Sequence, residues 1–148
     1  MTEVPFEIVE LDDNENVHPI VEAYIEDQVV RLVIDTGASH SCMSKKSIKH
    51  LIGKKDKKAD AVLGIGRGRS KNRFVRVPVF RIGDLEIYNY QFLSIQINHI
   101  NKMLSSLRLK PIDGLLGSDI LYNYKAVIDY KTRKITFDNN NAEIMQMP

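Results

Sequence analysis

Several short stretches of the chain alternate apolar and polar residues, a pattern typical of β-strands with one buried face. Apolar residues alternate with acidic ones from Phe6 to Leu11, which predicts an edge strand. Pro19–Ile25 and Val29–Ile34 are separated by three residues and predict a hairpin. The second arm of this hairpin is apolar at five of its six positions, which indicates burial on both faces.

The remaining chain contains further strand patterns and a few short helical ones. Strands are predicted over 59–65, 74–82, 85–97, 126–130 and 134–137. A helix over 45–52 is predicted after Ser44, which is a suitable N-cap. Apolar residues at helical spacing predict a helix over 100–107 capped by Asn98, and another short helix is expected to begin near Ser118. The chain is therefore predicted to be mainly β.

Length and composition restrict the class of protein. A chain of 148 residues, 43% hydrophobic and 27% charged, fits one domain with a buried core and excludes whole-chain disorder. The single cysteine, Cys42, excludes an internal disulfide and a cysteine-based zinc site. Polar turn residues and an Asn-rich end divide the chain into an acidic N-terminal strand and turn (1–16), a main domain (17–138) and a flexible tail (139–148).

Charge is segregated along the chain although the net charge is only +2. Residues 1–30 carry nine acids and no Lys or Arg, whereas residues 44–81 carry thirteen bases and two acids. The basic segment is either a nucleic-acid or acidic-peptide surface, or a solvated loop with the polar face of a strand pair. Only Phe74 could stack on a base within its run of arginines, so we expect no nucleic-acid partner.

The N-terminal residues also bear on location. They lack the basic start of a signal peptide, and no later run is apolar enough to span a bilayer. We therefore expect no membrane partner, and a cytoplasmic location if Met1 is the native start.

Asp35 is the first candidate for chemistry. It follows the apolar strand 29–34 directly, and an ionised carboxylate without partners is costly to bury there. The next residues supply donors, with hydroxyls on Thr36 and Ser39 and an unobstructed backbone N–H on Gly37. An Asx-turn at a strand end would give the same tripeptide, so the tripeptide alone leaves a structural and a functional interpretation open.

Two further motifs follow in a fixed order: GIGRG at 64–68, and GLLGSDIL at 114–121. With VIDTGAS at 33–39, AVIDY at 126–130 and KITF at 134–137, the chain resembles the retropepsin-like aspartic proteases over about residues 17–137. It is most similar to the small bacterial and retroelement-type members. The resemblance implies a closed acid-protease barrel with one or two short helices, with residues 17–138 as the protease domain.

The resemblance also implies a reaction, the hydrolysis of peptide bonds. This chemistry needs two carboxylates that share one proton, so that one activates a water and the other protonates the scissile carbonyl. The chain has one Asp-Thr-Gly, and Asp113, Asp119 and Asp129 lack the Thr/Ser-Gly that would make a second copy. A homodimer is therefore expected to place Asp35 beside its symmetry mate.

By the same resemblance, the other site residues have supporting roles. Thr36, Gly37, Ala38 and Ser39 would form the catalytic loop, in which Thr36 ties two loops together, Gly37 holds the carboxylates coplanar and Ser39 binds an outer carboxylate oxygen. Leu116 and Gly117 would pack beside this loop. A flap that closes over an extended peptide or protein substrate would be formed by Gly64, Ile65, Gly66, Arg67 and Gly68.

Three features depart from the family pattern. The flap carries Arg67, beside Arg69, which leaves open a preference for acidic substrates or an open flap. The segment 98–111 adds a helix that could pack on the sheet or extend a dimer contact. The usual terminal strand that interleaves two subunits is not evident in residues 139–148, although the N-terminal strand could substitute for it.

Other assignments are less favoured. The glycines at 64–68 precede strand formers rather than a helix, which argues against a dinucleotide loop. His40 and Cys42 lack further ligands, so no metal and no cofactor are expected. The rival to an endopeptidase is a catalytically inactive module that keeps the fold and binds peptides or dimerises.

Overall fold

The structure, a computed structural model, describes residues 1–11, 16–51 and 73–139. Its helices are η1 (Lys49–Leu51), α2 (Asn98–Ser106) and α3 (Ser118–Asn123). Its strands are β1 (Thr2–Pro5), β2 (Glu7–Leu11), β3 (Asn16–Ile25), β4 (Gln28–Ile34), β5 (Cys42–Ser44), β6 (Arg73–Ile82), β7 (Leu85–Ile95), β8 (Gly114–Leu116), β9 (Val127–Asp129) and β10 (Lys134–Phe137).

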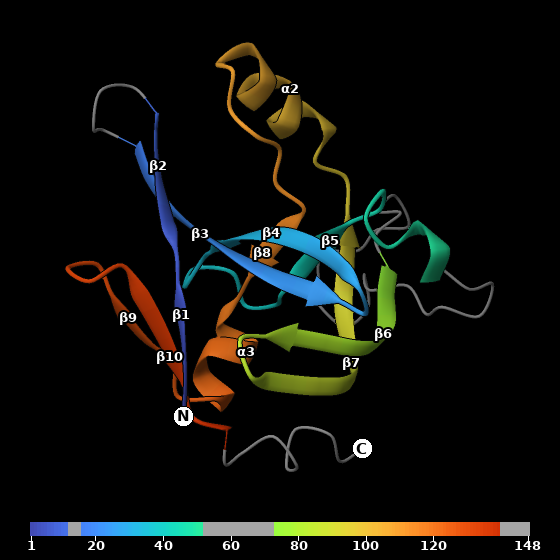
Figure 1. Cartoon of the computed structure of the whole chain (residues 1–148). Coiled ribbons are helices and arrows are strands. Elements are labelled where there is room, and N and C mark those ends of the chain that lie inside the picture. The colour runs from blue at the N-terminus through green and yellow to red at the C-terminus, as the bar shows by residue number, and fades with distance from the viewer. Residues whose placement is uncertain (12–15, 52–72, 140–148) are drawn as a thin grey trace.

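Six strands close into a barrel at the centre of the molecule (Figure 1). Neighbouring strands pair in the order β3, β4, β8, β5, β7 and β6, and β6 pairs back with the end of β3. The pairs β4–β8 and β5–β7 are parallel, and the other pairs of the barrel are antiparallel. The predicted closed, mainly β barrel with two short α-helices is confirmed.

A smaller sheet of three strands lies beside the barrel, in the order β1, β10, β9. β1 pairs antiparallel with β10, so that Thr2 lies opposite Phe137. The first described strand thus pairs with the last described one, as Figure 1 shows at the label N. The sequence pattern predicted the β9–β10 hairpin and β2 but not β1. The division of the chain at residues 16 and 138 stays a prediction, since residues 12–15 and 140–148 lie outside the described residues.

β4 corrects the prediction that this strand is buried on both faces. Val30, Leu32 and Ile34 are buried in the barrel core, whereas Val29 is 47% exposed and Val33 is only partly buried. Near the end of β4 the outer face is covered, because Val33 packs against a second apolar cluster that includes residues of α2. An apolar residue on the outer face of this strand is therefore not evidence that the residue is buried.

The helix predicted over 45–52 is shorter than expected. The Ser47 N–H does donate to Ser44 Oγ at 3.2 Å, as in an N-cap, but the chain then forms turns and the single 3₁₀ turn η1. The Ser47 hydroxyl donates to Asp113 Oδ1 at 2.6 Å, and Ile48 is fully buried. These tertiary contacts hold the segment against the barrel. The Ser47 side chain thus competes with the regular backbone hydrogen bonds of a helix.

Helix α2 confirms the second helical prediction with two differences at its ends. Ile97 occupies the N-cap position without a side-chain cap, and Asn98 is the first helical residue. The helix ends before Arg108, whose φ of 60° is left-handed, and so stops ahead of Pro111. Among the described residues, no helix has both the length and the apolar character needed to cross a membrane.

The centre of the barrel depends on close backbone contact at Gly114. Gly114 lies between Leu32 of β4 and Met43 of β5. A Cβ atom at this position would stand 2.0 Å from the Cys42 carbonyl oxygen and 3.0 Å from the Met43 Cα. Both obstacles are backbone atoms, so a side chain could fit only if β5 moved away from β8.

We expect Gly114→Ala to lower the free energy of unfolding by about 2–4 kcal/mol, because the added methyl group separates two paired strands. Urea unfolding followed by circular dichroism measures this loss. Gly37→Ala is the matched control, since its Cβ meets only Asp35 Oδ1, at 3.3 Å, in an exposed loop. Equal losses in the two variants would contradict the prediction.

Candidate functional site

The loop that carries Asp35 begins where β4 ends and lies against β8. The Asp35 N–H donates to the Leu116 carbonyl oxygen at 2.9 Å, which continues the parallel β4–β8 pairing by one residue. β4 is itself held on its other side by β3. The position of the Asp35 backbone is therefore set by the barrel, not by the loop alone.

The tip of this loop is a tight turn around the carboxylate. The Ala38 N–H donates to the Asp35 carbonyl oxygen at 3.1 Å, and the Gly37 N–H donates to Asp35 Oδ1 at 2.9 Å. The Asp35 side chain is partly buried, while Thr36 and Ser39 are exposed. The loop thus orients one carboxylate oxygen from within and presents its hydroxyl side chains outward.

The underside of the loop is clamped by the chain that leaves β8. The Ala38 carbonyl oxygen accepts the Ser118 N–H at 2.7 Å and the Ser118 hydroxyl at 3.1 Å. Gly117 permits this approach, since a Cβ there would stand 2.8 Å from the Ala38 oxygen and 2.9 Å from the His40 oxygen. The structure therefore brings Leu116 and Gly117 together with the Asp35 loop, and their supporting role at an active site stays a prediction.

A second polar cluster lies below the loop and centres on Asp119. The buried Ser41 hydroxyl accepts the Gly117 N–H at 2.9 Å and donates to Asp119 Oδ1 at 2.7 Å. The Tyr90 hydroxyl donates to Asp119 Oδ2 at 2.5 Å, and His40 Nδ1 lies 3.6 Å from the same oxygen. The Asp119 side chain is only 12% exposed. A nearly buried carboxylate thus links the loop, β7 and α3.

Burial and this carboxylate control the ionisation of two neighbours. The pKa of Tyr90 is raised, first by burial and then by the Asp119 charge and hydrogen bond. The pKa of the Cys42 thiol is raised to about 11, first by burial and then by the charges of Asp119 and Asp35. At neutral pH, Tyr90 is therefore a hydrogen-bond donor and Cys42 a neutral thiol, which argues against Cys42 as a nucleophile.

Sequence reasoning missed the residues Ser41, Tyr90 and Asp119. Asp119 drew attention only as a residue without the Thr/Ser-Gly of a catalytic aspartate, and Ser41 lies 78 residues from it along the chain. The available signal was an acidic residue among apolar ones in GLLGSDIL, where an unpaired charge would be costly. The identity of its partners could not be read from spacing.

The flap predicted from the GIGRG motif falls on a segment that the structure does not describe. Gly64, Ile65, Gly66, Arg67 and Gly68 lie outside the described residues. Their role stays a prediction.

An apolar pocket of about 300 Å³ reaches the Asp35 side chain. Its described walls come from β2, β3, β4, β8 and α2, and among the described lining residues only Asp35 and His18 have ionisable side chains. The other lining residues are Val9, Leu11, Ile20, Val33, Ile100, Met103, Leu104, Ile112 and Leu115.

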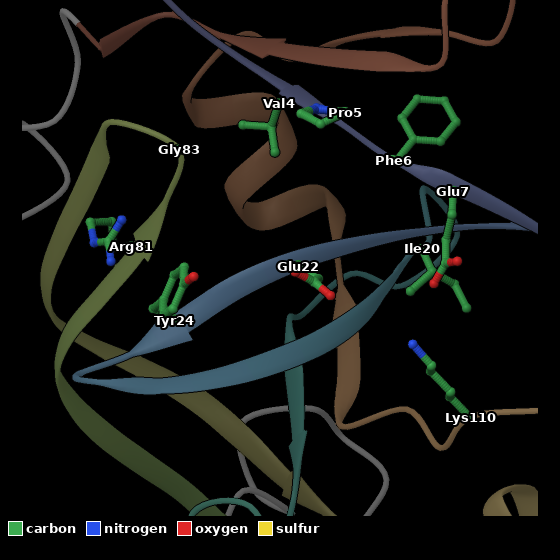
Figure 2. A pocket seen from close by; sticks show the side chains of 10 residues that line it. All are labelled: Val4, Pro5, Phe6, Glu7, Ile20, Glu22, Tyr24, Arg81, Gly83 and Lys110. Carbon is green, nitrogen blue, oxygen red and sulfur yellow. The ribbon is translucent and has the colours of Figure 1, made fainter.

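A larger hollow of about 490 Å³ lies at the crossing of β1, β2 and β3, and Figure 2 shows its lining. Charged side chains of both signs, among them Glu22, Arg81 and Lys110, stand between apolar ones there. None of the described residues that line it is a predicted site residue. The smaller pocket is therefore the one that Asp35 lines, although the hollow at β1, β2 and β3 is larger.

In the part of the chain that the structure describes, no three His, Cys, Asp or Glu side chains gather so that they could hold a metal ion. The His40 ring instead packs edge-on against Phe74, at 4.9 Å between centroids, and the Cys42 thiol donates to the His40 carbonyl oxygen at 3.2 Å.

Two solved structures have a similar fold. The retroviral protease-like domain of Ddi1 from Leishmania major superposes with a TM-score of 0.53 at 20% identity, over 82% of this chain and 89% of that one. A retropepsin-like aspartic protease from Rickettsia conorii gives 0.52 at 20% identity, over 91% of each chain. A search of curated proteins found no match. The structural likeness shows that the barrel is the retropepsin-like fold.

A sequence model of one protein family also matches the chain. The family is described as aspartyl protease, and the match covers residues 21–120. That range includes the Asp35 loop, the segment 114–117 and Asp119. The chain therefore belongs to the aspartyl protease family and has the retropepsin-like fold that its motifs predicted.

Proposed function

We propose that this protein is an aspartic endopeptidase whose active site is assembled from the Asp35 loops of two copies of the chain. The observation that carries the proposal is the Asp35 loop itself, which is clamped from below at Leu116 and Ser118 and exposed at Thr36 and Ser39. A rigid base with an open polar tip suits a loop that meets an identical loop across a two-fold axis.

The reaction needs two carboxylates with one proton between them. The ionised carboxylate accepts a proton from a water molecule, which attacks the scissile carbonyl carbon, while the protonated one donates to the carbonyl oxygen. Collapse of the tetrahedral intermediate breaks the C–N bond. The departing nitrogen takes a proton from the pair, and a hydroxyl of the intermediate returns one, so that the pair again holds a single proton. Like charges held this close cannot both ionise, so the shared proton follows from the geometry.

The second carboxylate is proposed to come from another copy because the described acids on the segments beside the Asp35 loop are engaged. Asp113 accepts the Arg31 N–H at 2.8 Å and the Ser47 hydroxyl at 2.6 Å. Asp119 accepts from Ser41 and Tyr90. Each carboxylate holds barrel segments together, so neither is free to bind the catalytic water beside Asp35.

The proposed substrate is an extended peptide or protein segment. Such a segment can add to the site as a strand, through backbone hydrogen bonds. Residues 64–68 would close over it and exclude water, and Thr36 and Ser39 would complete the loop contacts between the two copies. The reaction needs no metal or cofactor.

The position of the Asp35 loop is proposed to depend on the hydroxyl groups around Asp119. Ser41 joins Asp119 to the Gly117 N–H, and Gly117 contacts the loop at Ala38. Tyr90 supplies the other strong donor to this carboxylate. Loss of one donor would leave a nearly buried charge under-satisfied, at a cost of about 1–3 kcal/mol. Tyr90 is thus proposed as a positioning residue.

We expect Asp35→Asn to abolish peptide cleavage and, when mixed with wild-type protein, to inhibit it by forming mixed dimers. A mixed dimer has one carboxylate, so an equal mixture of exchanging subunits should retain roughly a quarter of the wild-type activity rather than half. Cleavage of an unbiased peptide library between about pH 4 and pH 7, read by mass spectrometry, measures this.

Light scattering on the same samples serves as the control for assembly. A linear fall of activity with the wild-type fraction would contradict the shared site. A proven dimer of wild-type chains that cuts no peptide would replace the endopeptidase with the inactive peptide-binding or dimerisation module.

Tyr90→Phe should lower kcat several-fold and the free energy of unfolding by about 1–3 kcal/mol, because the Asp119 carboxylate loses a donor. Tyr88→Phe is the matched control, since Tyr88 lies two residues away on β7 and its hydroxyl donates to the exposed Glu86. Steady-state kinetics and urea unfolding compare the two variants. If Tyr90→Phe lost stability without any change in kcat or KM, the residue would be structural and its positioning role would be wrong.

A further inference from the structure

Helix α2 forms one wall of the apolar pocket beside Asp35. Ile100, Met103 and Leu104 line the pocket from the helix, opposite Val33 of β4 and Leu115 of β8. Figure 1 shows α2 set apart from the barrel at the ends of two connecting segments, above β4 and β8. The pocket therefore lies between the barrel that carries Asp35, the edge strand β2 and a helix that is not part of the barrel.

The three helix residues contribute to this wall in different ways. Leu104 is buried in the apolar cluster with Ile20 and Ile112, so it holds the helix in place. Ile100 packs against the same cluster but is only partly buried, and Met103 is 46% exposed. Ile100 and Met103 are thus the helix side chains that an occupant of the pocket would touch.

The chemistry of the lining selects the occupant. Nine of the eleven described residues that line the pocket are apolar, so most of the surface that an occupant would touch offers no partner to a charged group. An acidic side chain would in addition meet the Asp35 carboxylate on the wall. A volume of about 300 Å³ accepts one large apolar side chain such as Phe or Leu.

We infer that α2 is the specificity-determining element of the site, and that Ile100 and Met103 set the size of the apolar substrate side chain bound next to the scissile bond. The inference rests on the proposed function, because it takes the pocket occupant to be part of a peptide aligned on Asp35. The flexible thioether of Met103 adapts the wall to side chains of different shape.

The test compares substitutions on two faces of one helix. Met103→Trp fills part of the pocket, and Ile100→Ala enlarges it. Lys102→Ala is the control, since Lys102 is exposed and lines a separate hollow with Lys46 and Asn98. Each change is made in the wild-type chain and in the Asp35→Asn chain. Urea unfolding verifies that every variant is folded.

Two readouts separate the inference from the proposed function. Wild-type-background variants digest a peptide library, and mass spectrometry gives the side chains that flank each cut. Asp35→Asn-background variants are immobilised and select peptides from the same library by affinity, without cleavage. We expect a preference for Phe and Leu in both readouts. Met103→Trp should reduce the preference for Phe over Ala about tenfold, Ile100→Ala should favour larger side chains, and Lys102→Ala should change neither.

The possible outcomes separate the role of α2 from the endopeptidase activity. Cleavage with no apolar preference, or with the same preference in all variants, overturns the role of α2 and leaves the endopeptidase standing. Affinity selection that follows Met103 and Ile100 without cleavage by any wild-type-background protein supports the pocket and overturns the endopeptidase. Failure of both backgrounds to select or cut any peptide overturns both.

Discussion

The arrangement of the Asp35 site depends on a close approach between two backbone segments, the chain that follows β4 and the chain that passes through β8. Gly114 admits the backbone of β5 on one side of β8, and Gly117 admits the loop oxygens of Ala38 and His40 at its end. The hydrogen bonds from the Asp35 N–H to Leu116 and from the Ser118 N–H to Ala38 are possible only at this distance. Backbone atoms cannot rotate out of the way, so the carboxylate is placed with little freedom.

This constraint explains why the sequence could predict the fold around the Asp35 loop. The GLLG motif reflects this close approach. A short buried strand that contacts backbone at both ends needs a glycine at each end and apolar residues between them. The barrel and the Asp35 loop were therefore readable from motifs and alternation. The contacts of Asp119 with Ser41 and Tyr90 were not, because side-chain partners from β7 and from the loop after β4 meet only in the folded barrel.

Local patterns failed where tertiary contacts outweighed local preference. The helix expected after Ser44 is replaced by turns because Ser47 bonds Asp113 and Ile48 enters the core. The outer face of β4 is apolar at Val33 because α2 and its cluster cover that end of the strand. The sequence of β4 alone does not indicate this cover. The strand β1 was missed because Thr2–Pro5 is short and acquires its partner only from β10.

The pairing of β1 with β10 gives the folding reaction an order. The partners Thr2 and Phe137 are separated by almost the whole chain, so closing this contact carries a large loop-closure entropy and a high contact order. During synthesis β1 lacks its β10 partner until the β9–β10 hairpin has been translated. The three-stranded sheet can thus form only after all strands of the barrel have been synthesised. Its β1–β10 pairing then joins the two ends of the described fold.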